Sequence, residues 1–236
     1  MKLKLCTLKS DEVHIWSASL SEAKNDVAYF ASLLSKDEHE QANSFRFYKD
    51  QKQYTISRGI LRSLLAGYLE EAPQTIEIAY GLWRKPYLAQ EKFLHFNVSH
   101  SRDYALYAFT RSYEVGIDLE HIDTTLDIEN IALSIFSPTE LNYWNTLSSE
   151  HKIDVFFKHW VCKEAFLKAS GKGWLENKKE LPYTKVWPQK QQQIDNLLKS
   201  KITYPYCFKC IPGYSSALFI DGPSLRLLYY VWDQDS

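Results

Sequence analysis

The pattern of hydrophobic and polar positions predicts a mixed α/β chain. Apolar residues at every second position predict strands, whereas apolar residues three and four apart predict helices. The strands expected in the first half are residues 12–17, 75–80, 93–98, 104–110 and 114–120. The helices expected there are residues 21–34, 36–46 and 49–69.

The second half carries a similar combination of elements. The run Ser137-Pro138-Thr139-Glu140 has the pattern of a helix start, with a capping box and proline at the first helical position. A long helix is expected from Glu150 to Ser170, closed by Gly171. Residues 172–201 are rich in lysine and glutamine and predict a loop region. The runs near 202–209, 214–220 and 225–232 predict a second sheet.

These elements form two strand–helix clusters joined near residues 121–130. We therefore expect an N-terminal lobe at 1–120 and a C-terminal lobe at 121–236, combined in one functional unit. The chain has 236 residues, of which 45% are hydrophobic, enough for one large or two small packed domains.

Charge and composition exclude several classes of protein. The formal net charge of −1 offers no broad basic surface for nucleic acid. No run of eighteen apolar residues could span a membrane, and the N-terminal twelve residues lack the apolar core of a signal peptide. We therefore expect a cytoplasmic protein without a membrane or nucleic-acid partner.

The chain has four cysteines, and only Cys207 and Cys210 form a C-x-x-C motif. A zinc site would require a second pair with similar spacing, which the sequence lacks. We therefore interpret Cys207 and Cys210 as core cysteines in a reducing compartment.

The predicted strand 114–120 contains two acids, Asp118 and Glu120, between apolar residues. Residues two apart on a strand point to the same side, so two negative charges face one point. One interpretation is a solvated outer face of an edge strand. The other is a hard cation held between the two carboxylates.

The long helix contributes a third acid. Trp160, Glu164 and Lys168 are spaced four residues apart, so they share one side of the helix. In an exposed helix, Glu164 and Lys168 would be a weak surface ion pair. Several large apolar residues surround them, however, and a buried carboxylate needs a partner. Asp118, Glu120 and Glu164 could together bind Mg²⁺, which prefers a few carboxylates and substrate phosphates.

Several other residues could bind phosphate groups. Ser99 and His100 lie at the end of a predicted strand, and Lys85 precedes it. Arg58 and Arg62 are one turn apart on the first long helix. Each also has a structural interpretation: a turn at a strand end, a cation in a loop, or a solvated helix face.

Together these segments resemble a known family. FNVSHS, GIDLE and WVCKEAFLKASGKGW, in this order, are similar to the motifs of the Sfp-type 4′-phosphopantetheinyl transferases. The resemblance covers roughly residues 12–232. The opening segment and the RGILR sequence are most similar to the cyanobacterial and plastid branch. It includes RGILRSLLAGYL before these motifs and IFSPTE after the acidic strand.

The resemblance implies a fold of two pseudo-symmetric α/β lobes, each a small antiparallel sheet packed with a long helix, with the site between them. It also implies Mg²⁺ and coenzyme A as ligands, and apo acyl or peptidyl carrier proteins as partners. The phosphopantetheine arm of coenzyme A would move onto a carrier serine, releasing adenosine 3′,5′-bisphosphate. We expect a monomer by the same analogy.

The roles of individual residues follow from the same resemblance. Asp118, Glu120 and Glu164 would bind the metal ion, and Lys168 with His100 would contact the pyrophosphate. Ser99 would contact the nucleotide, whereas Lys85 and Arg58, or Arg62 in its place, would hold the phosphates. Glu140 is a further candidate for a supporting or base role. Residues 35–47 lack the lysines that some members use on the nucleotide.

Three questions stay open at this level. The base could be Glu164, Glu140 or a metal-bound water. Another Mg²⁺-dependent phosphoryl enzyme, such as a nucleotide phosphatase, would explain the acids and cations, but not the combined motifs. A carrier-binding module without activity would also fit the resemblance, but the intact set of acids and Lys168 argues against it.

Overall fold

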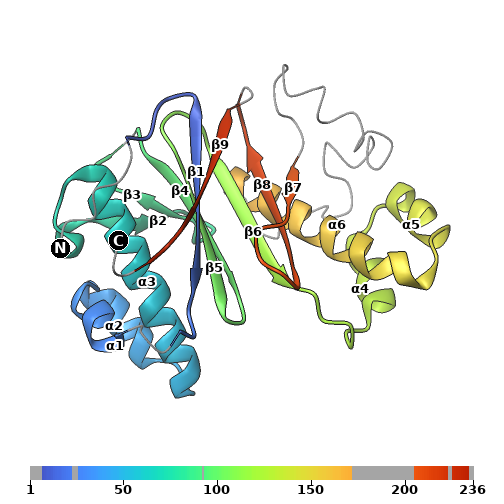
Figure 1. Ribbon diagram of the computed structural model, residues 1–236, viewed down its shortest axis with the longest axis horizontal. Helices are drawn as coiled ribbons and strands as arrows, with labels where there is room; N and C mark the ends of the chain where they lie inside the picture. Colours follow the sequence, from blue (N-terminus) through green and yellow to red (C-terminus); the bar gives the residue numbers. More distant parts are fainter. Residues whose placement is uncertain (1–6, 23–25, 92, 172–204, 223–224, 234–236) are drawn as a thin grey trace.

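The computed structural model describes residues 7–22, 26–91, 93–171, 205–222 and 225–233, and these form four layers (Figure 1). Helix α3 (Tyr48–Leu69) covers the outer face of one sheet, and α6 (Ser149–Ser170) covers the outer face of a second sheet. The inner faces of the two sheets pack on each other. This arrangement confirms the predicted α/β class, in which small sheets are packed with long helices.

The first sheet has four strands in the order β4-β5-β1-β9. Their bounds are β1 (Glu12–Ser19), β4 (His95–Ser101), β5 (Tyr104–Thr110) and β9 (Arg226–Val231). The pairs β4–β5 and β5–β1 are antiparallel, whereas β9 is parallel to β1. The end of the described chain therefore completes a sheet that begins near its start.

The expectation that the run 225–232 belongs to the second sheet is wrong, because β9 makes specific contacts with β1. Arg226 binds the buried carboxylate of Glu12. Tyr230 stacks on Trp16 with ring centroids 4.7 Å apart. These pairings lie more than 200 positions apart in the sequence, where local patterns carry no information.

The second sheet has three antiparallel strands in the order β6-β8-β7. They are β6 (Val115–His121), β7 (Tyr206–Phe208) and β8 (Tyr214–Ile220). Strand β6 thus lies in the first half of the chain but pairs with strands of the second half. The lobe limits 1–120 and 121–236 stay a prediction, and strand pairing crosses them in both directions.

Both long helices begin and end within one residue of the limits predicted for them. On α3, Ile56, Ile60 and Leu64 are fully buried at four-residue spacing and pack on the first sheet. Helix α6 ends at Gly171, which has a φ of +62°. Glycine adopts this left-handed conformation without steric cost, so it closes the helix as expected.

Shorter elements flank these layers. They are α1 (Val27–Ser32), α2 (Lys36–Asn43), α4 (Ile128–Ile135), α5 (Pro138–Asn145), a 3₁₀ turn at Pro73–Thr75, β2 (Ile78–Tyr80) and β3 (Pro86–Leu88). The predicted capping box at Ser137 and Glu140 is confirmed. Helix α4 and strand β3 were not predicted, and the expected helix 21–34 is described only at 27–32.

Some predictions fall on other parts of the chain. The loop 172–201 and Cys6 lie outside the described residues. The interpretation of Cys210 as a core cysteine is wrong, because its side chain is exposed. Within the ranges described, no helix is both long enough and apolar enough to cross a membrane.

Candidate active site

Strand β6 lies beside β4 and is joined to it through side chains. Polar residues at every second position of β4 accept hydrogen bonds from backbone amides of β6. The pairs are Asn97 with Ile117 at 2.9 Å, Ser99 with Leu119 at 3.3 Å, and Ser101 with His121 at 3.0 Å. The edge strand β4 of the first sheet is therefore bonded to β6 of the second sheet by side chains, and not by hydrogen bonds between the two backbones.

The same serines hold the two acids of β6. The hydroxyl of Ser99 donates to Oδ1 of Asp118 at 2.9 Å, and that of Ser101 donates to Oε2 of Glu120 at 2.9 Å. Each hydroxyl accepts a hydrogen bond from a β6 amide and donates one to a β6 carboxylate, so its orientation is determined. Asp118 is only 2% exposed, which excludes the interpretation as a solvated outer face.

Helix α6 approaches this part of β6 unusually closely at Gly116. A Cβ atom at this position would lie 1.9 Å from the carbonyl oxygen of Ala165 and 2.4 Å from the amide nitrogen of Ala169. Only glycine leaves room for this approach. The glycine of the GIDLE segment thus allows α6 to bring Lys168 to the acids.

The ammonium group of Lys168 lies against Asp118. Its Nζ atom is 2.6 Å from Oδ1 of Asp118 and donates to the Ser99 hydroxyl at 2.8 Å. Oδ2 of Asp118 is buried and has no hydrogen-bond partner among the described residues. An unpaired buried carboxylate oxygen is costly, so this atom is suited to bind a ligand.

Glu120 is affected by the negative charge of the neighbouring Asp118. The pKa of Glu120 is raised, first by burial and then by the neighbouring Asp118. Hydrogen bonds from Ser101 and Trp160 and the charge of Lys168 act in the opposite direction. A cation between Asp118 and Glu120 would relieve the repulsion, and the two carboxylates fit a hard metal ion in this respect.

The third predicted metal ligand, Glu164, is half-buried on α6. It lines a pocket of ≈ 380 Å³ with Lys168, Lys85, Asn97 and Arg84. No group of three or more His, Cys, Asp or Glu side chains in the described ranges is close enough to hold a metal ion. The role of Glu164 as a ligand therefore stays a prediction, although its place in the pocket wall beside Lys168 is clear.

His100 follows Ser99 on β4 and is exposed. The pKa of His100 is lowered, first because surrounding protein removes water from the ring and second because of the Lys168 ammonium. The charge of Asp118 acts in the opposite direction. The ring of His100 is therefore influenced by the charges of both Lys168 and Asp118, which agrees with a position close to them.

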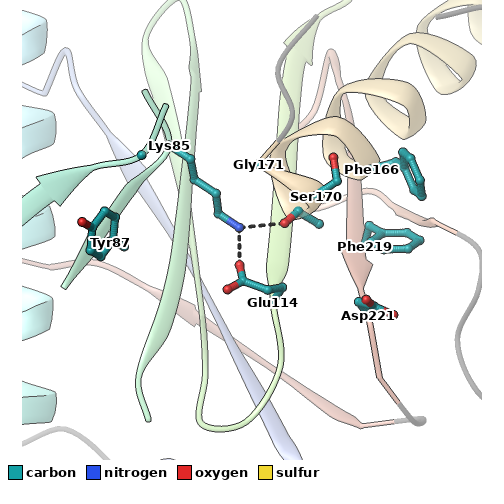
Figure 2. A pocket seen from close by; sticks show the side chains of 10 residues that line it. Lys85, Tyr87, Glu114, Phe166, Ser170, Gly171, Phe219 and Asp221 are labelled. Carbon is teal, nitrogen blue, oxygen red and sulfur yellow. Dashed lines mark hydrogen bonds and ion pairs between the residues drawn. The ribbon is translucent and has the colours of Figure 1, made fainter. Parts of the chain in front are cut away.

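Lys85 lies directly before β3 and reaches across to the second sheet and α6 (Figure 2). Its Nζ atom is 2.5 Å from Oε2 of Glu114 and donates to the carbonyl oxygen of Ala169 at 2.9 Å. The pKa of Glu114 is lowered to about 2, mainly by the hydrogen bond from His95, opposed by burial and assisted by Lys85. Glu114 therefore keeps Lys85 at the end of the pocket.

The Lys85–Glu114 ion pair also lines a second pocket, of ≈ 610 Å³ (Figure 2). Its walls include Tyr87, Phe166 and Phe219, with Lys85 and Glu114 between them. Lys85 and Gly171 line both pockets, so the aromatic pocket is adjacent to the one that contains Glu164.

Arg58 is on α3, and its side chain is 13% exposed. Its guanidinium hydrogen-bonds to the Tyr80 hydroxyl, and its Nε atom is 3.4 Å from Oε1 of Glu38. Burial acts to lower the pKa of Arg58, but the interactions with Tyr80 and Glu38 outweigh it and raise the pKa. Arg58 is not among the residues that line the Glu164 pocket.

Arg62 has a different environment from Arg58. It is 1% exposed, it binds Oε2 of Glu38, and it donates to the carbonyl oxygens of Pro73 and Ile76 at 2.5 and 3.2 Å. Contact with coenzyme A would require these bonds to break. The placement favours a structural role for Arg62, and its role in binding phosphate stays a prediction.

Glu140 is buried at the start of α5, where it completes the capping box with Ser137. Its carboxylate is 2.9 Å from Nζ of Lys163 and 3.4 Å from Nδ1 of His159, both on α6. Despite burial, the pKa of Glu140 is lowered, because His159 and Lys163 favour the charged form. These contacts fasten α5 to α6, and a base role for Glu140 stays a prediction.

Three residues that shape the site were not predicted as site residues from the sequence: Asn97, Ser101 and Glu114. A signal for the first two exists. The spacing N-x-S-x-S in β4 matches the two-residue spacing of the amides in β6. Glu114 gave no such signal, because an acid before a strand is common and its partners lie far away in the sequence.

Comparison with known proteins gives matches to both halves of the chain. The model of the 4′-phosphopantetheinyl transferase superfamily matches residues 114–209. A model of the N-terminal part of 4′-phosphopantetheinyl transferases matches residues 16–112. Every residue that we place at the site falls within one of these two ranges.

Individual relatives agree with these matches. The 4′-phosphopantetheinyl transferase HetI of a Nostoc species is 42% identical over 170 residues, 71% of this chain and 72% of the relative. Sfp of Bacillus subtilis is 29% identical over 154 residues, 65% of this chain and 66% of its own length. A Xenopus laevis L-aminoadipate-semialdehyde dehydrogenase-phosphopantetheinyl transferase is 26% identical over 182 residues, 72% of this chain and 60% of its own length.

Proposed function

Since the chain belongs to the 4′-phosphopantetheinyl transferase superfamily, we propose that it transfers the phosphopantetheine arm of coenzyme A to a serine of an apo acyl or peptidyl carrier protein. The reaction depends on Mg²⁺ and releases adenosine 3′,5′-bisphosphate. The observation that carries this proposal is the ammonium of Lys168 beside the acid pair Asp118 and Glu120, next to an open pocket.

Asp118, Glu120 and Glu164 are the residues that we assign to Mg²⁺. The buried, unpaired Oδ2 atom of Asp118 and the raised pKa of Glu120 support the first two assignments. When bound, the ion supplies positive charge that offsets the charge of the phosphates. Lys168 contributes a second positive charge, which stabilises the negative charge that the leaving bisphosphate gains.

The remaining cations and polar groups bind the substrate. Lys85 and Arg58 hold phosphate groups, and Arg58 reads the 3′-phosphate. Ser99 contacts the nucleotide, and His100 contacts the pyrophosphate beside Lys168. The attacking serine of the carrier must lose a proton, and Glu164 in the pocket wall is the group that we assign to accept it.

We further propose that the protein acts as a monomer. Both walls of the pocket come from one chain, because β4 and the segment before β3 form one side and α6 forms the other. A second copy is not needed to complete the set of residues described above.

The test is a mass-spectrometric assay with coenzyme A, Mg²⁺ and a panel of apo carrier proteins. The expected result is a gain of one phosphopantetheine group per carrier, with no gain when the carrier serine is replaced by alanine. Chelation of Mg²⁺ should abolish the gain. Release of inorganic phosphate without any carrier, with no carrier modified, would contradict the proposal and favour a phosphatase.

A further inference from the structure

The two cysteines of the C-x-x-C motif face opposite sides of the second sheet. Cys207 lies on β7 and packs in the apolar cluster between this sheet and α6, together with Cys162. Neighbouring residues of a strand point to opposite faces, and Phe208 accordingly points away from α6. Cys210 lines a pocket on that other face with Phe208 and Tyr229. The motif is therefore not a redox pair in itself.

The thiol of Cys207 instead meets a cysteine that is distant in the sequence. The Sγ atoms of Cys162 on α6 and Cys207 on β7 are 3.0 Å apart, and both thiols are free. We propose that Cys162 and Cys207 form an oxidation site that closes to a disulfide and fastens β7 to α6. This inference does not rest on the proposed transferase activity.

The geometry allows the bond with a small displacement. A disulfide has an S–S distance of roughly 2.0 Å, so the two sulfur atoms need to approach by about 1 Å. Cys162 is held in a buried helix, whereas Cys207 is in the three-residue edge strand of its sheet and is half-buried. Movement of β7 can therefore supply the displacement. Within the described part of the chain, the Sγ atom of Cys210 lies 3.9 Å from the Ser216 hydroxyl and is not paired with another thiol.

The oxidant that we name is a small disulfide such as oxidised glutathione. The Cys207 thiol is the more accessible one, so it loses its proton to water and attacks the glutathione disulfide, releasing one glutathione thiolate. Cys162 then loses its proton and attacks the mixed disulfide at the Cys207 sulfur, releasing the second. Two protein thiols are oxidised and one disulfide is reduced to two thiols, so electrons balance. Burial raises the pKa of Cys162, which agrees with its acting second.

The bond would stabilise the fold through the loop that it closes. Cys162 and Cys207 are 45 positions apart, and a disulfide across a loop of this size restricts the unfolded chain strongly. We expect an increase in the melting temperature of roughly 5–15 °C. Cys162 lies on the packed side of α6, whereas Glu164 faces the pocket, so the cross-link holds the helix from behind the site.

The experiment uses the full chain, reduced, freed of reductant and then treated with oxidised glutathione. Peptide mapping without reduction should identify a peptide that links Cys162 to Cys207, and the melting temperature should rise. Cys210→Ser is the matched control, because it removes the other cysteine of the motif and should leave both results unchanged. Cys207→Ser should abolish both.

Other results would overturn the inference. These are a link between Cys207 and Cys210, a link to Cys6, a glutathione adduct on Cys210 alone, or a Cys162–Cys207 link without a rise in melting temperature. If Cys207→Ser fails to fold, Cys162→Ala removes the same bond with an apolar residue at the buried position and serves in its place.

Discussion

The Nζ atom of Lys168 lies 2.6 Å from Oδ1 of Asp118, and the Ser99 hydroxyl donates to the same oxygen. One oxygen of the carboxylate thus has two donors, whereas the other is buried with none among the described residues. The arrangement stabilises the charge on Asp118 and leaves one oxygen for a ligand. It also places the Lys168 ammonium next to the expected position of the substrate pyrophosphate.

Asp118→Asn removes this charge with almost no change in shape. Transfer should fall by several powers of ten, because neither Mg²⁺ nor the pyrophosphate keeps its place. The melting temperature without metal should change by only a few degrees, since loss of the Lys168 pair is offset by relief of repulsion on Glu120. Steady-state kinetics in saturating Mg²⁺ and a thermal melt provide the measurement.

The control for Asp118→Asn is Asp154→Asn, which breaks a solvent-accessible ion pair with Lys158 on α6 and a longer one, of 3.9 Å, with Lys209. A surface pair of this kind contributes little, so both rate and stability should stay close to those of the unaltered protein. Normal turnover of Asp118→Asn would refute the metal-site assignment.

Glu164→Gln tests the acid on α6. If Glu164 binds the metal ion or accepts the serine proton, the rate should fall by roughly 10²–10⁴-fold. If Glu164 only interacts with Lys168 along the helix, stability should change by less than about 0.5 kcal/mol and the rate should be almost unchanged. Single-turnover kinetics with one apo carrier protein distinguish these cases, and a near-normal rate would return Glu164 to a structural role.

Arg58→Ala tests how coenzyme A is recognised. A guanidinium binds phosphate with charge-assisted hydrogen bonds that alanine cannot replace. Loss of such a bond costs about 1.5–3 kcal/mol, which corresponds to a ten- to hundredfold decrease in kcat/KM for coenzyme A. Use of 3′-dephospho-coenzyme A should hardly change. Equal losses on both substrates would show that Arg58 does not read the 3′-phosphate.

Arg62→Ala is the matched control one turn along α3. It removes a buried partner of Glu38 and two bonds to carbonyl oxygens, so it should lower the free energy of unfolding by about 3–5 kcal/mol. The two substrates should be affected equally. Selectivity for the 3′-phosphate should therefore be lost in Arg58→Ala and kept in Arg62→Ala.

Glu114→Gln gives a prediction on pH. The pKa of Glu114 is about 2 in the folded protein against 4.5 without partners, so its charged form is favoured by folding. Its contribution to stability is fully present above pH 4.5 and is lost as pH falls toward about 2. The melting temperature of the unaltered protein should exceed that of Glu114→Gln near neutral pH, and the difference should shrink below pH 4.5.

Melting curves of both proteins from about pH 7 down to about pH 3 test this sign, because effects of other carboxylates cancel in the difference. A difference that is constant or grows toward low pH would contradict it. Glu114→Gln should also raise KM for coenzyme A without lowering kcat, since Glu114 contacts Lys85 and not the acids of β6.

Local patterns were sufficient for the parts of the site that each element carries on its own. The spacing of Asp118 and Glu120, the common side of Glu164 and Lys168, and the closure of α6 at Gly171 follow from strand and helix periods. The close approach of α6 to β6 at Gly116 was not predicted, because it depends on the distance between two backbones that are far apart in the sequence.

Features that depend on distant partners could not be predicted. Arg58 and Arg62 look equivalent in the sequence, yet one is half-buried beside Tyr80 and the other is enclosed by Glu38 and carbonyl oxygens. Strand β9 has the same pattern as the strands of the second sheet. Its choice of β1 as a partner is decided by contacts such as Arg226 with Glu12.

The side-chain bonds between β4 and β6 also bear on motion. Two domains joined by a linker can open and close like a hinge around a substrate. Here, separating β4 from β6 would break three buried or half-buried hydrogen bonds. It would also remove the hydrogen bonds that the serines of β4 donate to Asp118 and Glu120. Coenzyme A would therefore enter a rigid site that is already assembled, and substrate-dependent movement is left to the flanking elements.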